Sequence, residues 1–418
     1  NLMSQILKIL LKIIFRRIRR QLLPEISVNQ YGFMKDCGTR NAIFLIRMLS
    51  ERAIEHQQDL YMVFIDYTKA FDRVKHKELF KMLKNIQIDE KDLRLLYNLY
   101  QQQTATVRLP GGMTSEFEIR RGVRQGCVGS PDLFNLYSEI ILRSLEDVDE
   151  GFVVNGVLLN NIRYADDTVL LATSQEGLQR LFNTLAEESK RYGLSINAKK
   201  TKCMVVSKLT PSPICTLYQD KTKIEQVTSF NYLGSLVTSD GRSRDEIRRR
   251  IIIAKSSFGT MRSVLTDRKL SLPIRTRLLK CDVWSTLLYG CESWTITAET
   301  RRNIEAAEMW FFRRMLRISY MERITNEEVL NRVHQKRQLY RTILDRQAKF
   351  LGHSIRKGKL ENLVLQGRIQ GRRARGRQRR TLMNNFPKLP AGRIWTLARE
   401  RKLAHSWLAS RPEDGHGT

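Results

Sequence analysis

The adjacent aspartates Asp166 and Asp167 constrain the fold of this chain more than any other feature of its sequence. They lie between two short β-like runs, Ile162–Tyr164 and Thr168–Ala172, which predicts a hairpin with both acids at its tip. Neighbouring carboxylates repel each other, and asparagine or serine would serve a simple turn better, so the pair favours a bound cation. A solvated turn is the alternative, because acidic residues are common in turns.

A third aspartate directly follows a predicted strand. Leu60–Ile65 is a continuous apolar run of strand length, Asp66 comes next, and a helix-like pattern spans Lys69–Leu83. If the end of this strand and the tip of the hairpin lie in one sheet, Asp66 and Asp166 come together. With Asp167 they could then hold two divalent ions about 4 Å apart. This arrangement suits phosphoryl transfer, in which one ion lowers the pKa of an attacking hydroxyl and the other neutralises a departing pyrophosphate.

The charge of the chain points to a polyanionic partner. Among 418 residues, 73 are lysine or arginine and 43 are acidic, a formal net charge of +30, while 42% are hydrophobic. The hydrophobic fraction argues against extensive disorder, and the charge favours nucleic acid as the partner, with an anionic membrane surface as the alternative. No run of about 18 uncharged apolar residues is present, so no membrane-spanning helix is predicted. The six cysteines have neither Cys-x-x-Cys nor zinc-finger spacing, which favours reduced, intracellular thiols.

The two halves of the chain differ in their predicted secondary structure. Further strands are predicted at Met204–Ser207 and Tyr232–Thr238, and with the interspersed helices they indicate an α+β fold with a mainly antiparallel sheet. From about Arg242 onward, long helical periodicities dominate, and Gly367–Arg380 is a basic stretch too polar to pack. Helix starts are predicted from capping-box patterns at Ser243–Glu246 and Thr325–Glu328 and from Pro273.

Five ordered segments resemble the motifs A to E of reverse transcriptases, and their details resemble the enzymes of non-LTR (LINE-like) retrotransposons. The resemblance covers nearly the whole chain, because Ile26–Phe33 is similar to the segment before motif A and Phe350–Ile355 to the C-terminal part. An ordered set of motifs is far more specific than any one of them. The five segments are Phe64–Asp72, Arg121–Pro131, Arg163–Asp167, Gly193–Thr201 and Tyr232–Gly234.

The resemblance implies an α+β, right-hand polymerase fold. Its expected parts are partial fingers at residues 1–50, a palm with interleaved fingers elements at 51–240, a helical thumb at 241–345 and a basic nucleic-acid-binding region at 346–418. The apolar stretch Leu2–Phe15 is interrupted by lysines and is interpreted as an amphipathic helix. Because the chain begins with Asn1 and no counterpart of the family's first basic fingers strand precedes it, we expect an N-terminally truncated sequence.

The resemblance also implies the roles of the acidic residues. Asp66 and Asp166 would bind the metal ions directly, and Asp167 would support the same metal site. Lys200 matches the lysine of motif D that donates a proton to the departing pyrophosphate. Its two neighbouring lysines are alternatives for this role, and a solvated basic face is the alternative for all of them.

Three further positions resemble the nucleotide-binding residues of the family. Phe71 would lie beneath the sugar of the incoming nucleotide and exclude a 2′-hydroxyl by its shape, with core packing as the alternative. Gln125 and Gly126 begin a turn, and the glycines Gly126 and Gly129 would let the backbone approach a template or nucleotide closely.

Other segments resemble nucleic-acid contacts. Tyr232, Leu233 and Gly234 resemble the primer grip, with an ordinary sheet edge as the alternative. Clustered arginines would face phosphates in the thumb and in the basic C-terminal region, where nuclear targeting or a solvated linker is the alternative. These arginines are Arg313, Arg314, Arg372, Arg373, Arg375, Arg377, Arg379 and Arg380.

The sequence thus predicts an RNA-directed DNA polymerase that serves retrotransposition. It would add deoxynucleotides to a DNA 3′-hydroxyl on an RNA template, using two Mg²⁺ ions, or Mn²⁺ in their place, for phosphoryl transfer. Its expected partners are template RNA, primer or target DNA and deoxynucleoside triphosphates, without a membrane and with no prediction of oligomeric state. It would occur in nucleus and cytoplasm as a ribonucleoprotein. The alternative is a catalytically silent, nucleic-acid-binding remnant of a retrotransposon, and the intact acids favour the enzyme.

Overall fold

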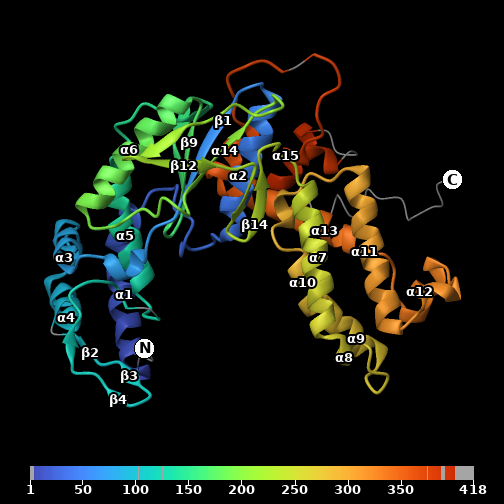
Figure 1. The fold of residues 1–418 in the computed structure, drawn as a ribbon, viewed down its shortest axis with the longest axis horizontal. Helices are drawn as coiled ribbons and strands as arrows, with labels where there is room; N and C mark the ends of the chain where they lie inside the picture. Colours follow the sequence, from blue (N-terminus) through green and yellow to red (C-terminus); the bar gives the residue numbers. More distant parts are fainter. Residues whose placement is uncertain (1–3, 102, 125, 374, 387–390, 401–418) are drawn as a thin grey trace. The chain divides into compact units, whose positions relative to one another are not determined.

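The computed structural model describes residues 4–101, 103–124, 126–373, 375–386 and 391–400 (Figure 1). The chain forms two compact units. Their boundaries differ from those of the four expected parts, so the assignment of fingers, palm and thumb stays a prediction. The first unit contains the described residues up to Ala42, then Asp59–Val205 and Leu209–Val227, and the second contains Ile43–Gln58, Val206–Lys208 and the described residues from Thr228 onward.

A six-stranded sheet forms the centre of the first unit, in the order β11-β12-β10-β1-β9-β8. The apolar run of β1 is buried along nearly its whole length, which suits a strand with neighbours on both sides. The predicted hairpin is confirmed as β8 and β9, and β9 also pairs antiparallel with β1. The sheet is not antiparallel throughout, because β10 and β12 run parallel. The strands are β1 (Leu60–Ile65), β8 (Asn161–Tyr164), β9 (Asp167–Ala172), β10 (Lys202–Val206), β11 (Leu217–Gln219) and β12 (Thr222–Gln226).

Helices cover this sheet and extend the core of the first unit. Helix α6 packs on β1, β9 and β11, and α5 packs on α1, α3 and α6 (Figure 1). The expected N-terminal amphipathic helix is confirmed as α1, which continues to Glu25, whereas the helix expected at Lys69–Leu83 is divided into a 3₁₀ turn at Ala70–Arg73 and helix α3. The helices are α1 (Gln5–Glu25), α3 (His76–Asn85), α4 (Glu90–Tyr100), α5 (Ser130–Arg143) and α6 (Gln175–Arg191).

Short two-stranded sheets complete the first unit. They pair β2 with β5, β3 with β4 and β6 with β7. The strands are β2 (Thr104–Ala105), β3 (Arg108–Leu109), β4 (Gly112–Met113), β5 (Phe117–Glu118), β6 (Phe152–Val154) and β7 (Val157–Leu159).

The second unit is mostly helical, as the sequence predicts. Its aromatic core includes the fully buried rings of Trp294, Phe311 and Phe312. None of the helices in the described part of the chain is long and apolar enough to span a membrane. Its helices are α2 (Thr39–Glu55, whose first turn belongs to the first unit), α7 (Arg244–Thr260), α8 (Arg262–Leu265), α9 (Leu272–Leu278), a π-helical turn (Leu279–Trp284), α10 (Ser285–Leu287), α11 (Ala298–Leu316), α12 (Asn326–Val333), α13 (Leu339–Lys357), α14 (Leu360–Gln366) and α15 (Ala391–Arg399).

Two local predictions in the second unit are wrong. The strand expected at Tyr232–Thr238 is a hairpin of β13 (Ser229–Tyr232) and β14 (Ser235–Thr238). Ser243 directly precedes α7, which confirms the predicted helix start, but the capping hydrogen bond expected from its side chain is absent. Its hydroxyl instead accepts hydrogen bonds from Arg47 and from the amide of Thr295, because these long-range donors take the oxygen that a local cap would use.

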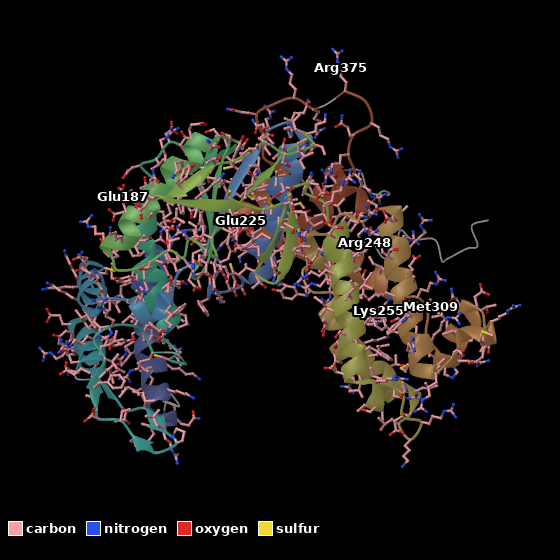
Figure 2. The ribbon with its side chains drawn as sticks, in the orientation of Figure 1. Glu187, Glu225, Arg248, Lys255, Met309 and Arg375 are labelled. Carbon is pink, nitrogen blue, oxygen red and sulfur yellow. The ribbon has the colours of Figure 1, made fainter. Side chains whose placement is uncertain are left out.

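The basic stretch Gly367–Arg380 forms hydrogen bonds and an ion pair with the rest of the second unit. The expectation that it is too polar to pack is therefore wrong. Arg52 of α2 donates a hydrogen bond of 2.7 Å to the carbonyl oxygen of Gly367. Gln57 donates to the carbonyl oxygen of Arg372 at 2.9 Å. The carboxylate of Glu55 forms a 2.8 Å ion pair with Arg373. The C-terminal end of α2 and the residues just after it therefore anchor this stretch, while the side chain of Arg375 points away from the ribbon in Figure 2.

Candidate active site

The fold brings the three predicted acidic residues to one edge of the central sheet. Ile65 at the end of β1 pairs with Thr168 of β9, so Asp66 follows the strand where the hairpin opens. Tyr164 and Asp167 are the last paired residues of the hairpin, which leaves Asp166 in its tip. The expectation that a strand end and a hairpin tip share one sheet is therefore confirmed.

The carboxylates at this edge repel one another. Partial burial raises the pKa of Asp166, and the negative charge of Asp66 adds to the rise. Desolvation raises the pKa of Asp167 to about 6, with further contributions from Asp166 and Asp66. Asp167 is solvent-accessible, and the negative charges of Asp166 and Asp66 raise its pKa in the same direction as desolvation does. Among the described residues no lysine or arginine forms a salt bridge with any of the three.

These carboxylates do not by themselves form a closed cage for an ion. Nowhere in the described ranges are three or more His, Cys, Asp or Glu side chains gathered closely enough to hold a metal. Magnesium is commonly bound through one or two carboxylates together with substrate phosphates. The open acidic edge fits that mode of binding, in which a triphosphate would supply further oxygen ligands.

The segment before β1 holds the backbone of the hairpin tip. The side-chain oxygen of Gln30 accepts hydrogen bonds from the amides of Gly32, at 2.7 Å, and Ala165, at 3.0 Å. A Cβ at Gly32 would lie only 2.2 Å from the amide nitrogen of Ala165, so glycine is required by close backbone approach. The sequence alone did not predict a role for Gln30 or Gly32. The one sequence feature that pointed to them was the resemblance of Ile26–Phe33 to the segment before motif A.

A buried ion pair supports the same hairpin from α5. Arg163 donates to both carboxylate oxygens of Glu139, at 2.9 and 3.2 Å, and both side chains are 2% exposed. Arg163 also donates to the side chain of Asn161, while Glu139 accepts from the amide of Ser27. Removing one partner of such a buried pair typically costs about 3–5 kcal/mol, because the other charge is left uncompensated.

The predicted motif D loop lies beside Asp66. The amide of Asn197 donates to the carbonyl oxygen of Asp66 at 2.8 Å, and the amide of Lys200 donates to that of Asn197 at 3.1 Å. Lys200 is exposed. Lys202, one of the two alternatives to Lys200, is instead engaged with the carboxylate of Glu225 at 2.5 Å. This ion pair makes Lys202 a weaker candidate for a proton donor than Lys200.

Phe71 lies in an aromatic cluster. Its ring stacks on that of Phe134 in α5, with centroids 4.2 Å apart and an interplanar angle of 16°. Phe33 meets it edge-on at 6.4 Å and 84°. The carbonyl oxygen of Phe71 accepts a hydrogen bond from the amide of Val123, so the predicted motif B segment holds its backbone. Phe71 is partly buried, and both predicted roles, core packing and sugar recognition, agree with this position.

The predicted motif B glycines have different roles. Gly126 has a φ of 81° and nothing within 4 Å of a Cβ position, which agrees with an open turn that approaches a substrate. A Cβ at Gly129 would lie 1.8 Å from the ring of Phe15, so Gly129 makes room for α1 and not for a template. Gln125 lies outside the described residues.

The predicted primer grip is a tight turn in the second unit. Leu233 and Gly234 have φ values of 47° and 79°, which reverses the chain between β13 and β14. The hydroxyl of Tyr289 donates to the carbonyl oxygen of Leu233 at 2.7 Å, and Arg250 donates to that of Gly234. The guanidinium of Arg250 also lies 4.5 Å from the centre of the Tyr289 ring.

Further contacts fix the strands beside this turn. Tyr232 is buried at the end of β13. Arg47 of α2 donates to the carbonyl oxygen of Leu236 at 2.5 Å, and burial lowers the pKa of this arginine to about 10. Arg250 is in turn held by the buried carboxylate of Glu246, 2.7 Å from its Nε. Sequence reasoning missed these supporting side chains, because the partners of Arg47 and Tyr289 are distant in sequence.

The predicted nucleic-acid-binding arginines are not equivalent. Arg313 donates to the carbonyl oxygen of Ile324 at 2.6 Å and to Asn326, so it holds the start of α12. Arg314 is exposed beside the indole of Trp310. In the basic stretch, desolvation lowers the pKa of the partly buried Arg379. Of the predicted arginines in this stretch, Arg372, Arg373, Arg375, Arg377 and Arg380 are exposed.

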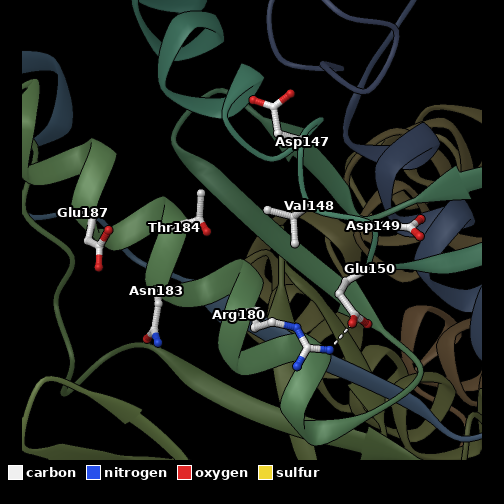
Figure 3. A pocket seen from close by; sticks show the side chains of 8 residues that line it. All are labelled: Asp147, Val148, Asp149, Glu150, Arg180, Asn183, Thr184 and Glu187. Carbon is white, nitrogen blue, oxygen red and sulfur yellow. Dashed lines mark hydrogen bonds and ion pairs between the residues drawn. The ribbon is translucent and has the colours of Figure 1, made fainter.

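The first unit also contains an acidic cavity of about 460 Å³ (Figure 3). Glu150 and Arg180 form an ion pair on its wall. None of the predicted site residues lines this cavity, so it is separate from the acidic edge of the sheet. Its lining residues are Asp147, Val148, Asp149, Glu150, Arg180, Asn183, Thr184 and Glu187.

Comparison with known families agrees with the motif order. The sequence profile of the family described as "Reverse transcriptase (RNA-dependent DNA polymerase)" matches residues 1–237. The chain belongs to the reverse transcriptase family. This membership confirms the family predicted from the motifs and the α+β right-hand polymerase fold class, and reverse transcriptases generally depend on divalent metal ions.

Curated relatives of this reverse transcriptase include proteins of retrotransposable elements and of a mobile element. A Pol polyprotein from the type-2 element R2DM of Drosophila melanogaster is 28% identical over 225 residues, covering 51% of this chain and 21% of the relative. The corresponding protein from the type-1 element R2 of Popillia japonica is 27% identical over 314 residues, covering 72% and 42%. An RNA-directed DNA polymerase from the mobile element jockey of Drosophila funebris is 25% identical over 313 residues, covering 72% and 33%. The chain therefore spans less than half the length of each.

A solved structure to which the chain is similar has a lower sequence identity than these relatives. A telomerase from Candida albicans, in complex with a fragment of telomeric RNA, is 12% identical to this reverse transcriptase, with a TM-score of 0.44, covering 79% of this chain and 58% of the other.

Proposed function

We propose that this reverse transcriptase copies RNA into DNA in the life cycle of a non-LTR retrotransposon. The observation that supports the proposal best is the meeting of Asp66, Asp166 and Asp167 at one edge of the central sheet, in a chain whose family carries out this reaction. The relatives named as retrotransposon Pol polyproteins and RNA-directed DNA polymerases support RNA as the template and DNA as the product. The net charge of +30 supports binding to both.

Asp66 and Asp166 would hold two Mg²⁺ ions, or Mn²⁺ in their place, with Asp167 supporting the site. When bound, the ions supply Lewis-acid activation of a primer 3′-hydroxyl and neutralise charge on the pyrophosphate that leaves. Lys200, exposed beside the Asp66 loop, would donate a proton to that pyrophosphate. Phe71 would lie against the sugar of the incoming deoxynucleotide, and Gly126 would bring its backbone close to the substrate.

The second unit would bind the primer and the template. Its turn at Tyr232, Leu233 and Gly234 would hold the primer end, since the carbonyl groups of the turn are fixed by Tyr289 and Arg250. The exposed arginines of the basic stretch would bind phosphates. We also propose that the protein works as a ribonucleoprotein in nucleus and cytoplasm.

Primer extension by the purified chain tests this proposal. A labelled DNA primer on an RNA template, with MgCl₂ and all four deoxynucleotides, should be extended, and Asp66→Asn or Asp166→Asn should reduce the rate by several orders of magnitude. Asp220→Asn is the matched control, because Asp220 is an exposed aspartate in a turn of the same sheet, between β11 and β12. Template binding without extension by the parent chain would support the nucleic-acid-binding remnant in place of the enzyme.

A further inference from the structure

Phe33 has an unusual backbone conformation for a bulky residue. Its φ is 60°, in the left-handed region that glycine occupies freely and that aromatic residues rarely adopt. Its side chain is also 50% exposed, so it buries too little surface to be explained as a core residue. A strained conformation of this kind persists where neighbouring structure imposes it, and such positions cluster at functional sites.

The neighbouring structure fixes the backbone on either side of Phe33. The amide of Gly32 donates to the side chain of Gln30 at 2.7 Å, and the carbonyl oxygen of Gly32 accepts from the buried Asn135 of α5 at 2.9 Å. After Phe33, the amide of Cys37 donates to the carbonyl oxygen of Met34 at 3.2 Å. The backbone on both sides of Phe33 is therefore fixed, in part by Gln30, whose side chain also accepts from the amide of Ala165 in the tip of the β8–β9 hairpin.

The ring of Phe33 meets the ring of Phe71 edge-on. Phe71 is supported on one face by Phe134, with ring centroids 4.2 Å apart. Phe33 approaches from another direction, edge-to-face at 6.4 Å, within the range of favourable aromatic pairs. With one neighbour against its face and another at right angles, the Phe71 ring is restricted in both tilt and displacement.

We propose that Phe33 is a positioning residue for Phe71 and thereby sets the discrimination between deoxyribonucleotides and ribonucleotides. The inference rests on the proposed function, in which Phe71 lies against the sugar. Exclusion of a 2′-hydroxyl by shape requires that the Phe71 ring is held rigidly, because a small shift of a mobile ring would easily accommodate a single added oxygen. Phe33 supplies the restraint that Phe134 alone leaves incomplete.

The test compares three variants at this position. Phe33→Gly removes the ring where the backbone favours glycine, Phe33→Ala removes it and keeps the strain, and Phe33→Tyr keeps an aromatic edge. The readout is the ratio of kcat/KM for a deoxynucleotide to that for the matching ribonucleotide in single-nucleotide primer extension. The control is Phe117→Ala, which removes a ring of nearly equal exposure, 48%, from strand β5.

Both ring-removing variants should lower the ratio by about tenfold or more, while Phe33→Tyr and Phe117→Ala stay within about twofold of the parent. The melting temperature of Phe33→Gly should be at least that of Phe33→Ala, since only the alanine retains the strained φ. An unchanged ratio in Phe33→Gly, with normal deoxynucleotide addition by the parent, would overturn the inference and leave the proposed function standing. If the parent adds no deoxynucleotide at all, the proposed function fails and this inference fails with it.

Discussion

Replacing Gly32 by alanine should greatly slow catalysis while the first unit still folds. The new Cβ would lie 2.2 Å from the amide nitrogen of Ala165, 2.9 Å from the carbonyl carbon of Tyr164 and 3.0 Å from the Cα of Ala165. All three are backbone atoms, so no flexible side chain can move aside. The nearest contact is about 1.2 Å short of the 3.4 Å at which ordinary van der Waals contact begins. The hairpin tip, or the segment facing it, must therefore shift by roughly 1 Å.

The effect on catalysis follows from this displacement. Asp166 is the next residue after Ala165, so it moves with the hairpin backbone relative to Asp66. A misplacement of about 1 Å at a reacting centre costs on the order of a hundredfold in rate, or about 2.7 kcal/mol in the activation free energy. The decrease in folding stability should be about 1–3 kcal/mol, because the added carbon overpacks the site and breaks the hydrogen bond between Gln30 and Ala165.

Single-turnover primer extension at saturating deoxynucleotide measures the loss of catalytic rate, and thermal unfolding measures the loss of folding stability. Gly38→Ala is the matched control, because Gly38 lies six residues further along, with nothing within 4 Å of its Cβ position and an ordinary φ. We expect this control to extend the primer at the parent rate. A Gly32→Ala variant that is folded and equally fast would refute the argument that this glycine sets the position of Asp166.

Three further predictions concern the second unit. Tyr289→Phe removes one hydrogen bond to the turn at Leu233, the predicted primer grip, and should lower primer extension about two- to tenfold. The effect is measured as kcat and primer KM, and unchanged values of both would contradict this prediction. Burial raises the pKa of Glu51 from 4.5 to about 7, so this residue contributes stability that is fully present below pH 4.5 and is lost as pH rises through 7, by up to about 3 kcal/mol. Thermal unfolding of Glu51→Gln should therefore depend less on pH between about pH 5 and pH 8, and equal dependence in both proteins would show that Glu51 does not titrate in this range. Replacing the exposed Arg375 and Arg377 by alanine should reduce the slope of log Kd for RNA against log salt concentration by roughly 0.7–0.9 for each phosphate that is no longer neutralised. Arg373→Ala should change this slope less, because the guanidinium of Arg373 is paired with Glu55. Identical slopes for the parent, the double variant and Arg373→Ala would place these arginines outside the RNA interface.

The sequence by itself determined the parts of the site that depend on local pattern. The apolar run at Leu60–Ile65 is a strand because its residues suit a buried central position, and the hairpin around Asp166 and Asp167 follows from two β-like runs with a turn between them. The order of motifs along the chain was enough to predict the family, since that order is recorded in the sequence and requires no knowledge of contacts.

Only the tertiary structure decided which residues support those local elements. Ser243 has the pattern of a helix cap, yet its hydroxyl is taken by Arg47, nearly two hundred residues away in the chain. Gly129 has the pattern of a substrate-facing turn, yet its open side is filled by the ring of Phe15 from α1. For Ser243, a local capping preference worth about 1 kcal/mol is overridden by a long-range contact. Such contacts depend on how distant segments pack, and a pattern read along one segment does not contain that information.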